Sequence, residues 1–328
     1  MKGGIFMKRW TVIFIPFLVG GIFFTGTTFG QQKIVQIGVL QFASHPALDA
    51  ARDGFIDFLA QAGFKDGEKT KLDLQNAQRD MSVARTIAKK FVGDNKDLIY
   101  AIATPASQAA VKETQSIPII FNAVTDPVKA GLVKAVESSG NNVTGVSDLI
   151  HVKTQIELLL KIVPRVKKLG IIYNAGEDNS RVLVGMTKGV AKELRLDLVD
   201  ATVTNSGEVF AATQTLVGRV DGIYVIQDNT VVSALESVIK VANKNMIPVL
   251  VPGTPSVERG GLATVGTNYF NLGKMAGEQA VRIIKGGKPS EIPVAFAKDF
   301  DIYLNQKTAD EIGIKFPEDL VKKAKKIF

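Results

Sequence analysis

Hydroxyl side chains follow several of the strands that the first half of this sequence predicts. Ser44, Thr104, Ser107 and Thr125 come after short apolar runs, at or near the start of a helical pattern. The N–H groups of a helix's first turn have no partner within the helix and can bind an anion together with nearby hydroxyls. These four residues therefore predict a site for a ligand carboxylate. Thr104, which precedes Pro105, is explained equally well as a helix start.

The second half of the chain places acidic and amide groups at a matching position. Asp228 and Asn229 follow a buried strand pattern, and an ionised aspartate there could pair with a ligand ammonium group. A role as helix N-cap is an equally good interpretation of either residue. Gln41 and Phe42, after the first strand, and Tyr269, at a later strand end, complete the candidate ligand-binding residues. The two aromatic rings could stack on an apolar ligand side chain, although rings at such positions are as often core packing.

No catalytic, nucleotide-binding or metal-binding motif is present. The sequence contains neither GxxxxGK[ST] nor GxGxxG after a strand. Ser44, His45 and Asp126 could suggest a hydrolase, but no GxSxG motif supports them, so catalysis is the weakest alternative. The only histidines, His45 and His151, are far apart, and we interpret them as a loop-shaping residue and a surface residue. We therefore predict no catalytic residue, no metal site and no cofactor.

The elements that must position these residues alternate between strand and helix. A buried strand around Ile37–Leu40 leads into a helix beginning near Pro46, and the same order repeats along the first half. Further strands are predicted at Leu72–Ala77, Leu98–Ala103 and Ile117–Asn122. This alternation is typical of a doubly wound, parallel α/β sheet, whose ligands bind outside the carboxyl ends of the strands.

The pattern restarts after an interruption at Asn142–Asp148. We therefore predict two Rossmann-like lobes with a central cleft. The first lobe comprises 31–147 plus about 255–290, and the second comprises 148–254 plus about 291–328. In this division, the strand and helix after Gly261 return to the first lobe, the last segment crosses back to the second, and a final helix spans Pro317–Ile327.

The first 30 residues are typical of a secretory signal peptide. Lys2, Lys8 and Arg9 precede an apolar run from Trp10 to Phe24, and small or polar residues lead to a predicted cleavage after Gly30. An uncleaved membrane anchor is the alternative, but the run is shorter than the roughly 20 residues that a membrane span prefers. We predict a soluble, monomeric, periplasmic or otherwise extracytoplasmic protein.

Charge and cysteine content narrow the class further. Removal of the three basic residues before the cleavage site lowers the formal net charge from +8 to +5, and the remaining positive charges are scattered. No basic stripe interleaved with aromatic residues is present, so we predict no nucleic-acid partner. The sequence contains no cysteine, which excludes a disulfide framework, cysteine catalysis and a lipid-modified cysteine anchor.

Seven segments of the chain resemble a known family, and together they cover nearly the whole predicted mature chain. These segments are SHPALDAARDGF (44–55), ATPASQAA (103–110), VTDPVKAGLV (124–133), NVTGVSD (142–148), DNTVVSAL (228–235), GGLATVGTNYFNLG (260–273) and LNQKTADEIGIKFPEDL (304–320). In them the sequence resembles periplasmic ABC-transporter substrate-binding proteins of the type I, two-lobed fold, in the group that includes tryptophan- and tyrosine-binding members.

The resemblance implies two lobes crossed three times by the chain, and an ABC permease with its ATPase as partners. It carries ligand contacts onto Ser44, Thr104, Ser107, Thr125, Asp228 and Asn229. It implies a receptor that captures a small ligand by lobe closure, with an amino acid, preferably aromatic, as the expected ligand. A sugar- or nucleoside-binding receptor and a sensor-linked receptor of the same fold are the alternatives. The chain departs from the family pattern at Val251–Val257, where VPGTPSV replaces a more polar stretch.

Overall fold

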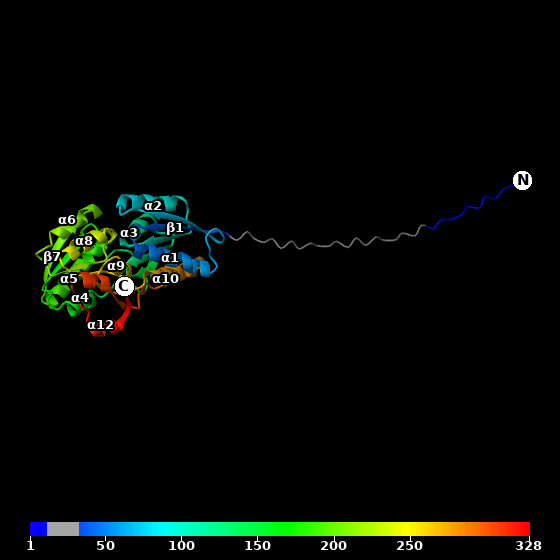
Figure 1. Ribbon diagram of the computed structural model, residues 1–328. Helices are drawn as coiled ribbons and strands as arrows, with labels where there is room; N and C mark the ends of the chain where they lie inside the picture. The colour runs from blue at the N-terminus through cyan, green and yellow to red at the C-terminus, as the bar shows by residue number, and fades with distance from the viewer. Residues whose placement is uncertain (12–32) are drawn as a thin grey trace. The chain divides into compact units, whose positions relative to one another are not determined.

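The computed structural model describes residues 1–11 and 33–328, which divide into two units, Met1–Lys33 and Ile34–Phe328. Nearly all of the apolar run of the predicted signal peptide, and its cleavage junction at Gly30, lie outside the described residues. Among the described residues, no helix is both long and apolar enough to cross a membrane. The second unit carries the helices and strands described below (Figure 1).

Six parallel strands form the first sheet, in the order β11-β5-β4-β3-β1-β2. Their bounds are β1 (Val35–Gln41), β2 (Thr70–Asn76), β3 (Leu98–Ile102), β4 (Ile119–Val124), β5 (Val143–Ser147) and β11 (Ala295–Phe296). Every residue of β3, β4 and β5 is buried. These strands are buried along their whole length because helices cover both faces of the sheet.

Four helices pack on this sheet, and with it they form what we call the first lobe: α1 (Pro46–Gln61), α2 (Met81–Gly93), α3 (Thr104–Glu113) and α10 (Tyr269–Ile284). Helix α10, from the far end of the sequence, lies beside α1 (Figure 1). The two backbones approach closely at glycines: a Cβ on Gly273 would lie 2.1 Å from the carbonyl oxygen of Ala51. Glycines at the contact therefore determine how closely α10 packs against α1.

Seven strands form the second sheet, in the order β13-β12-β10-β9-β8-β6-β7. Their bounds are β6 (Lys168–Asn174), β7 (Asp197–Val203), β8 (Gly222–Val225), β9 (Val249–Leu250), β10 (Ala263–Gly266), β12 (Asp301–Leu304) and β13 (Ala324–Ile327). All neighbours pair in parallel except β10 and β12, which are antiparallel. The predicted fold class, two α/β sheets of mostly parallel strands, is confirmed.

The helices of the second lobe surround this sheet: α4 (Val152–Ile162), α5 (Asp178–Glu193), α6 (Val209–Gln214), α7 (Asn229–Ser233), α8 (Leu235–Lys244), α9 (Thr254–Glu258), α11 (Gln306–Glu311) and α12 (Glu318–Lys323). One continuous apolar cluster fills the first lobe, and two others fill the second. Each sheet therefore has its own hydrophobic core.

The chain passes between the two sheets three times, and two of the passages differ from the expected ones. The first follows β5, which ends at Ser147. The strand after Gly261 was expected in the first lobe, but β10 pairs with β9 and β12 of the second sheet, so only α10 returns. The last passage lies between β11 and β12, after the expected position near 291, because Ala295 and Phe296 still pair with β5.

The end of the chain also differs from the sequence prediction. The final helix α12 ends at Lys323, and Ala324–Ile327 form strand β13 instead of continuing the helix. Pairing with β12 supplies backbone hydrogen-bond partners for these residues, and this tertiary contact outweighs their helical propensity. The correction concerns an edge strand of the second sheet.

Candidate functional site

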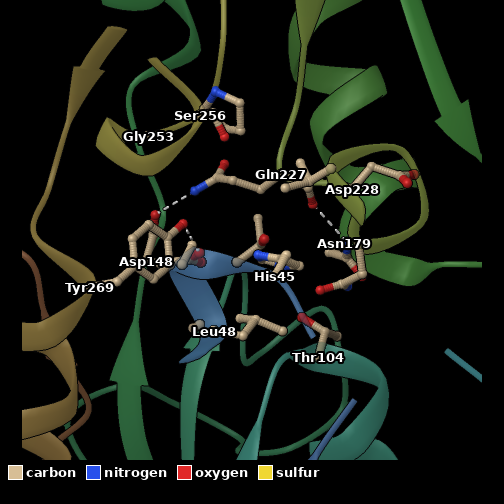
Figure 2. A pocket seen from close by; sticks show the side chains of 16 residues that line it. His45, Leu48, Thr104, Asp148, Asn179, Gln227, Asp228, Gly253, Ser256 and Tyr269 are labelled. Carbon is tan, nitrogen blue, oxygen red and sulfur yellow. Dashed lines mark hydrogen bonds between the residues drawn. The ribbon is translucent and has the colours of Figure 1, made fainter. Parts of the chain in front are cut away.

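A pocket lies between the two lobes, at the carboxyl ends of strands from both sheets (Figure 2). Asp148 and Tyr269 lie at the ends of two segments that connect the lobes. The first lobe also contributes His45, Ala47, Leu48, Thr104, Ala123 and Thr125, and the second contributes Asn179, Gln227, Asp228, Asn229, Val232, Pro252, Gly253 and Ser256.

Four helices begin at the pocket without a side-chain cap. Their N-cap residues are His45 for α1, Ala103 for α3, Glu177 for α5 and Gly253 for α9, and none of the four makes a capping hydrogen bond. In contrast, Asp228 caps α7 and Asn268 caps α10. The uncapped first turns leave N–H groups without intrahelical partners at the cleft. The long helices α1 and α3 are therefore suited to an anionic ligand group.

The backbone that presents α3 is held in an uncommon conformation. Ala103, which follows β3, has a φ angle of +82°. Ala123, the next-to-last residue of β4, has a φ angle of +54°. Non-glycine residues with positive φ cost about 1 kcal/mol or more each, and they concentrate at functional sites. Beside them, the Thr104 hydroxyl is buried and has no hydrogen-bond partner. The first-lobe wall of the pocket therefore offers an unused donor at a helix N-terminus.

His45 lies in the middle of the drawn pocket (Figure 2). Burial, reinforced by the positive charge of Arg259, lowers the pKa of His45 to about 3, and a contact with Asn229 acts in the opposite direction. The imidazole is therefore neutral at physiological pH. Its Nδ1 atom is buried without a partner. His45 is thus available to a ligand as a neutral hydrogen-bonding group.

Asp148 is a buried carboxylate with one unsatisfied oxygen. Its Oδ2 accepts a 2.8 Å hydrogen bond from the Tyr269 hydroxyl, whereas Oδ1 has no partner. Gln227 Nε2 donates to the backbone carbonyl of Asp148 at 2.8 Å, which leaves Gln227 Oε1 unpartnered as well. Burial raises the pKa of Asp148 to about 6. Asp148 Oδ1 and Gln227 Oε1 are thus two buried acceptors without partners, on two residues that line the pocket.

Asp228, by comparison, is fully engaged by the protein. Its Oδ1 accepts the Val231 N–H at 2.8 Å, and its Oδ2 accepts the Asn174 N–H and the Ser180 hydroxyl, each at 2.6 Å. Burial and the nearby charge of Glu177 raise the pKa of Asp228 to about 7. The sequence left two roles open for Asp228, a ligand contact and a helix N-cap. These hydrogen bonds match the role of N-cap.

Five of the nine sequence-predicted site residues line the pocket: Thr104, Thr125, Asp228, Asn229 and Tyr269. The other four do not. Gln41 turns its amide toward Ala43 and Asp49, and Phe42 packs in the first-lobe core. Ser44 is exposed and accepts a hydrogen bond from Asn76. Ser107 lies one turn inside α3, where its hydroxyl donates to the Ala103 carbonyl at 2.9 Å.

The sequence interpretation missed five polar lining residues: His45, Asp148, Asn179, Gln227 and Ser256. Gln227 immediately precedes Asp228, and Asp148 closes the segment NVTGVSD, so adjacency to predicted features could have identified both. Nothing local identifies Asn179, which enters the pocket from the first turn of α5. Within 1–11 and 33–328, no group of three or more metal-ligating side chains is found.

Comparisons with known proteins agree on one family. A family model described as "ABC transporter substrate binding protein" matches residues 36–328. A relative named "Tyrosine-binding protein", from Clostridioides difficile (strain R20291), is 44% identical over 285 residues, which are 87% of this chain and 83% of the relative.

Two solved structures resemble this one to different degrees. One is described as an ABC domain in complex with L-Trp from Streptococcus pneumonia; it is 37% identical, with a TM-score of 0.87, and the match covers 90% of this chain and all of the other. The second is described as the ligand-free, open structure of a substrate-binding protein with adhesive properties from Clostridium difficile. It is 43% identical, with a TM-score of only 0.68, over 89% of this chain and 99% of the other.

Proposed function

Because the chain belongs to the ABC transporter substrate-binding protein family, we propose that it is an extracytoplasmic receptor for an aromatic amino acid. The two lobes close on the ligand and present it to an ABC permease, whose ATPase drives import. The observation that carries the proposal is the buried, unsatisfied Oδ1 of Asp148 in a pocket that also contains an uncapped helix N-terminus.

The pocket offers separate places for the two charged groups of an amino acid. The ammonium group donates to Asp148 Oδ1 and to Gln227 Oε1, both of which are buried acceptors without partners. The carboxylate accepts from the Thr104 hydroxyl and from the first-turn N–H groups of α3. The ligand carboxylate thus binds at the first-lobe helix start, as the sequence analysis predicted. The partner of the ligand ammonium group is Asp148 instead of the predicted Asp228.

The rest of the pocket suits a large apolar side chain. Leu48, Val232 and Pro252 line it together with two alanines. A tyrosine-binding relative and an L-Trp-bound neighbour, both more than 35% identical to this chain, favour an aromatic ligand. The loop Val251–Val257, which departs from the family pattern, places Pro252, Gly253 and Ser256 in the lining, so it contributes to the choice of ligand.

The lobe arrangement described here is a closed one. The TM-score is higher to the L-Trp complex than to the open, ligand-free structure, although the open structure is more similar in sequence. A hydrogen bond of 2.6 Å from Gln108 in α3 to Asp178 in α5 joins the two lobes. Movement about the three connecting segments would open the cleft, as is usual for two-lobed receptors.

The proposal includes export and a non-enzymatic role. The basic start and apolar run of residues 1–24 support secretion with cleavage after Gly30. Mass spectrometry of the protein from its native host is expected to find an N-terminus at Gln31. An intact Met1 would contradict cleavage. The protein is expected to act as a monomer and to return its ligand chemically unchanged.

Isothermal titration of the purified protein with L-tyrosine, L-tryptophan, glycine and myo-inositol tests the ligand assignment. We expect saturable binding of at least one aromatic amino acid, and none of myo-inositol. Asp148→Asn should abolish binding without unfolding the protein. Binding of the sugar alone, or unaltered amino-acid binding by the variant, would contradict the proposal.

A further inference from the structure

The side chain of Asn179 is held in one orientation at the pocket wall. Its Nδ2 donates to Glu177 Oε2 at 3.0 Å and to the backbone carbonyl of Gln227 at 2.8 Å. A flipped amide would set oxygen against oxygen at both contacts, so the assignment of nitrogen and oxygen follows from the neighbours. Both amide hydrogens are thus used by the protein, and Oδ1 is the atom left for another partner.

Glu177, which fixes Asn179, is itself immobilised. Its carboxylate accepts the Thr230 N–H at 3.0 Å, the Thr230 hydroxyl at 2.8 Å and the Asn229 Nδ2 at 2.6 Å. These donors come from the first turn of α7, so the carboxylate binds a helix N-terminus. Asn179 therefore rests on a rigid base, and its Oδ1 is a preorganised acceptor.

The acceptor is unsatisfied and buried. Asn179 is 4% exposed, lines the pocket, and has no hydrogen-bond partner for Oδ1. Buried polar atoms are nearly always hydrogen-bonded, so an orphan acceptor at a ligand site indicates a donor on the ligand. In Figure 2, Asn179 lies on the side of the pocket occupied by Asp228, across from Asp148 and Tyr269. One ligand must therefore carry two donors at separate positions.

We propose that Asn179 Oδ1 accepts a hydrogen bond from a donor on the ring of the ligand side chain, and that this contact selects a phenol or an indole over an unsubstituted benzene ring. The inference rests on the proposed function, because it takes the ammonium group to occupy Asp148. With the ammonium group there, the side chain extends past His45 and Leu48 toward Asn179. Tyrosine has an O–H on its ring and tryptophan an N–H, whereas phenylalanine has neither.

The selectivity follows from the cost of leaving the acceptor unpaired. A phenylalanine ring excludes water from Asn179 Oδ1 and returns no hydrogen bond. A site built to hydrogen-bond a ligand group rejects the analogue that lacks it far more strongly than it rejects a change of shape. We therefore expect phenylalanine to bind at least ~10-fold, and up to ~100-fold, more weakly than the better of tyrosine and tryptophan.

The test is a calorimetric titration of the wild-type protein and of Asn179→Ala with L-tyrosine, L-tryptophan, L-phenylalanine and 4-fluoro-L-phenylalanine. In the wild type, the fluorinated ligand, which replaces the hydroxyl without supplying a donor, should bind as weakly as phenylalanine. In Asn179→Ala, the affinity for the preferred ligand should fall to within about threefold of that for phenylalanine, while phenylalanine binding changes little.

Two controls separate the possible outcomes. Asn243→Ala removes another buried amide oxygen without a partner, outside the pocket, and should leave all four affinities unchanged. Asp148→Asn should abolish the binding of all four ligands, which tests the proposed function alone. Equal wild-type affinities for phenylalanine and the preferred ligand, or an unchanged ratio in Asn179→Ala, would overturn the role of Asn179 while leaving the receptor assignment intact. If the wild-type protein binds none of the four ligands, both proposals fail.

Discussion

The hydroxyl of Tyr269 donates a 2.8 Å hydrogen bond to Asp148 Oδ2 and so joins two of the segments through which the chain passes between its lobes. Asp148 directly follows β5, where the chain first leaves the first sheet, and Tyr269 begins α10, where the chain returns. The carboxylate proposed to bind the ligand ammonium is therefore oriented by two of the segments that connect the lobes. Asp148 thus connects the proposed ligand contact to the geometry of the connecting segments.

Tyr269→Phe should shift the pH dependence of ligand binding to higher pH. Burial raises the pKa of Asp148 to about 6, and the hydrogen bond from Tyr269 counters that rise. Without the hydroxyl, the pKa rises further, so the carboxylate becomes protonated at a higher pH and loses its attraction for ammonium there. Titrations between pH 5 and 8.5 should show the wild-type affinity falling as the pH drops through about 6. The affinity of the variant should fall at a higher pH.

Tyr173→Phe provides the matched control for this experiment. The Tyr173 hydroxyl also donates to an aspartate, Asp200, at 3.2 Å, but neither residue lines the pocket. Its removal should leave the binding profile in place. A profile that is identical in wild type and Tyr269→Phe would show that Asp148 ionisation does not govern binding.

Asp148→Asn should stabilise the ligand-free protein at neutral pH while it removes ligand binding. The pKa of Asp148 is raised from the ordinary 3.8 to about 6, so the folded state holds this proton more tightly than the unfolded chain does. The free energy of unfolding therefore falls as pH rises through this window, by up to about 3 kcal/mol. Denaturation at pH 4 and pH 7.5 should show a gain for the variant at pH 7.5 and little difference at pH 4.

Asp228→Asn is the informative comparison, because the sequence analysis assigned the ligand ammonium group to Asp228. Asp228 caps α7 and accepts hydrogen bonds from Asn174 and Ser180. Its replacement should change stability more than affinity. Loss of binding in Asp228→Asn together with normal binding in Asp148→Asn would restore the original assignment.

The parts of the site that follow a local rule were predictable from sequence. Thr125 directly follows β4 and Thr104 comes two residues after β3, and the rule that ligands bind beyond the carboxyl ends of parallel strands places both at the cleft. The same rule fails for Ser44 by one position, since His45 is the N-cap of α1 and enters the pocket, whereas Ser44 faces solvent. A shift of one residue at a helix start decides which side chain reaches a ligand.

The parts that depend on distant contacts were not predictable. Asp148 gains its role from Tyr269, 121 residues later in the chain, and from Gln227 on the other lobe. Strand β10 has the same strand–helix pattern as the elements before it, so nothing local indicates which sheet it joins. Sequence periodicity predicts the layers of the fold, but a tertiary hydrogen bond or a strand pairing decides these assignments.

Gly273→Ala should destabilise the first lobe. The added Cβ would lie 2.1 Å from the carbonyl oxygen of Ala51 and 2.8 Å from the amide nitrogen of Phe55, so α10 must move away from α1. Overpacking of this kind costs about 1–3 kcal/mol. Gly189→Ala in α5, where a Cβ meets nothing within 4 Å, should instead stabilise by roughly 0.5–1 kcal/mol through helix propensity. Chemical denaturation measures both, and equal effects would refute the close approach of the helices.

Gln108→Ala should weaken ligand binding without destabilising the unliganded protein. Gln108 Nε2 donates to Asp178 Oδ2 at 2.6 Å across the cleft, a contact that the proposed opening of the lobes would break. A hydrogen bond to a charged group at a partly exposed site contributes about 1 kcal/mol, so its loss from the closed form alone should reduce affinity about fivefold. Gln61→Ala, which removes a glutamine bonded within its own lobe, should have no such effect.

A double-mutant cycle isolates the cross-lobe bond from the other contacts of its two residues. Gln108 also donates to the Ala130 carbonyl within the first lobe, and Asp178 pairs with Arg181 within α5. If the bond between the lobes stabilises closure, Asp178→Ala reduces affinity by a similar factor and the double variant is no weaker than either single variant. Additive losses would mean that each residue acts within its own lobe and that closure depends on the ligand contacts alone.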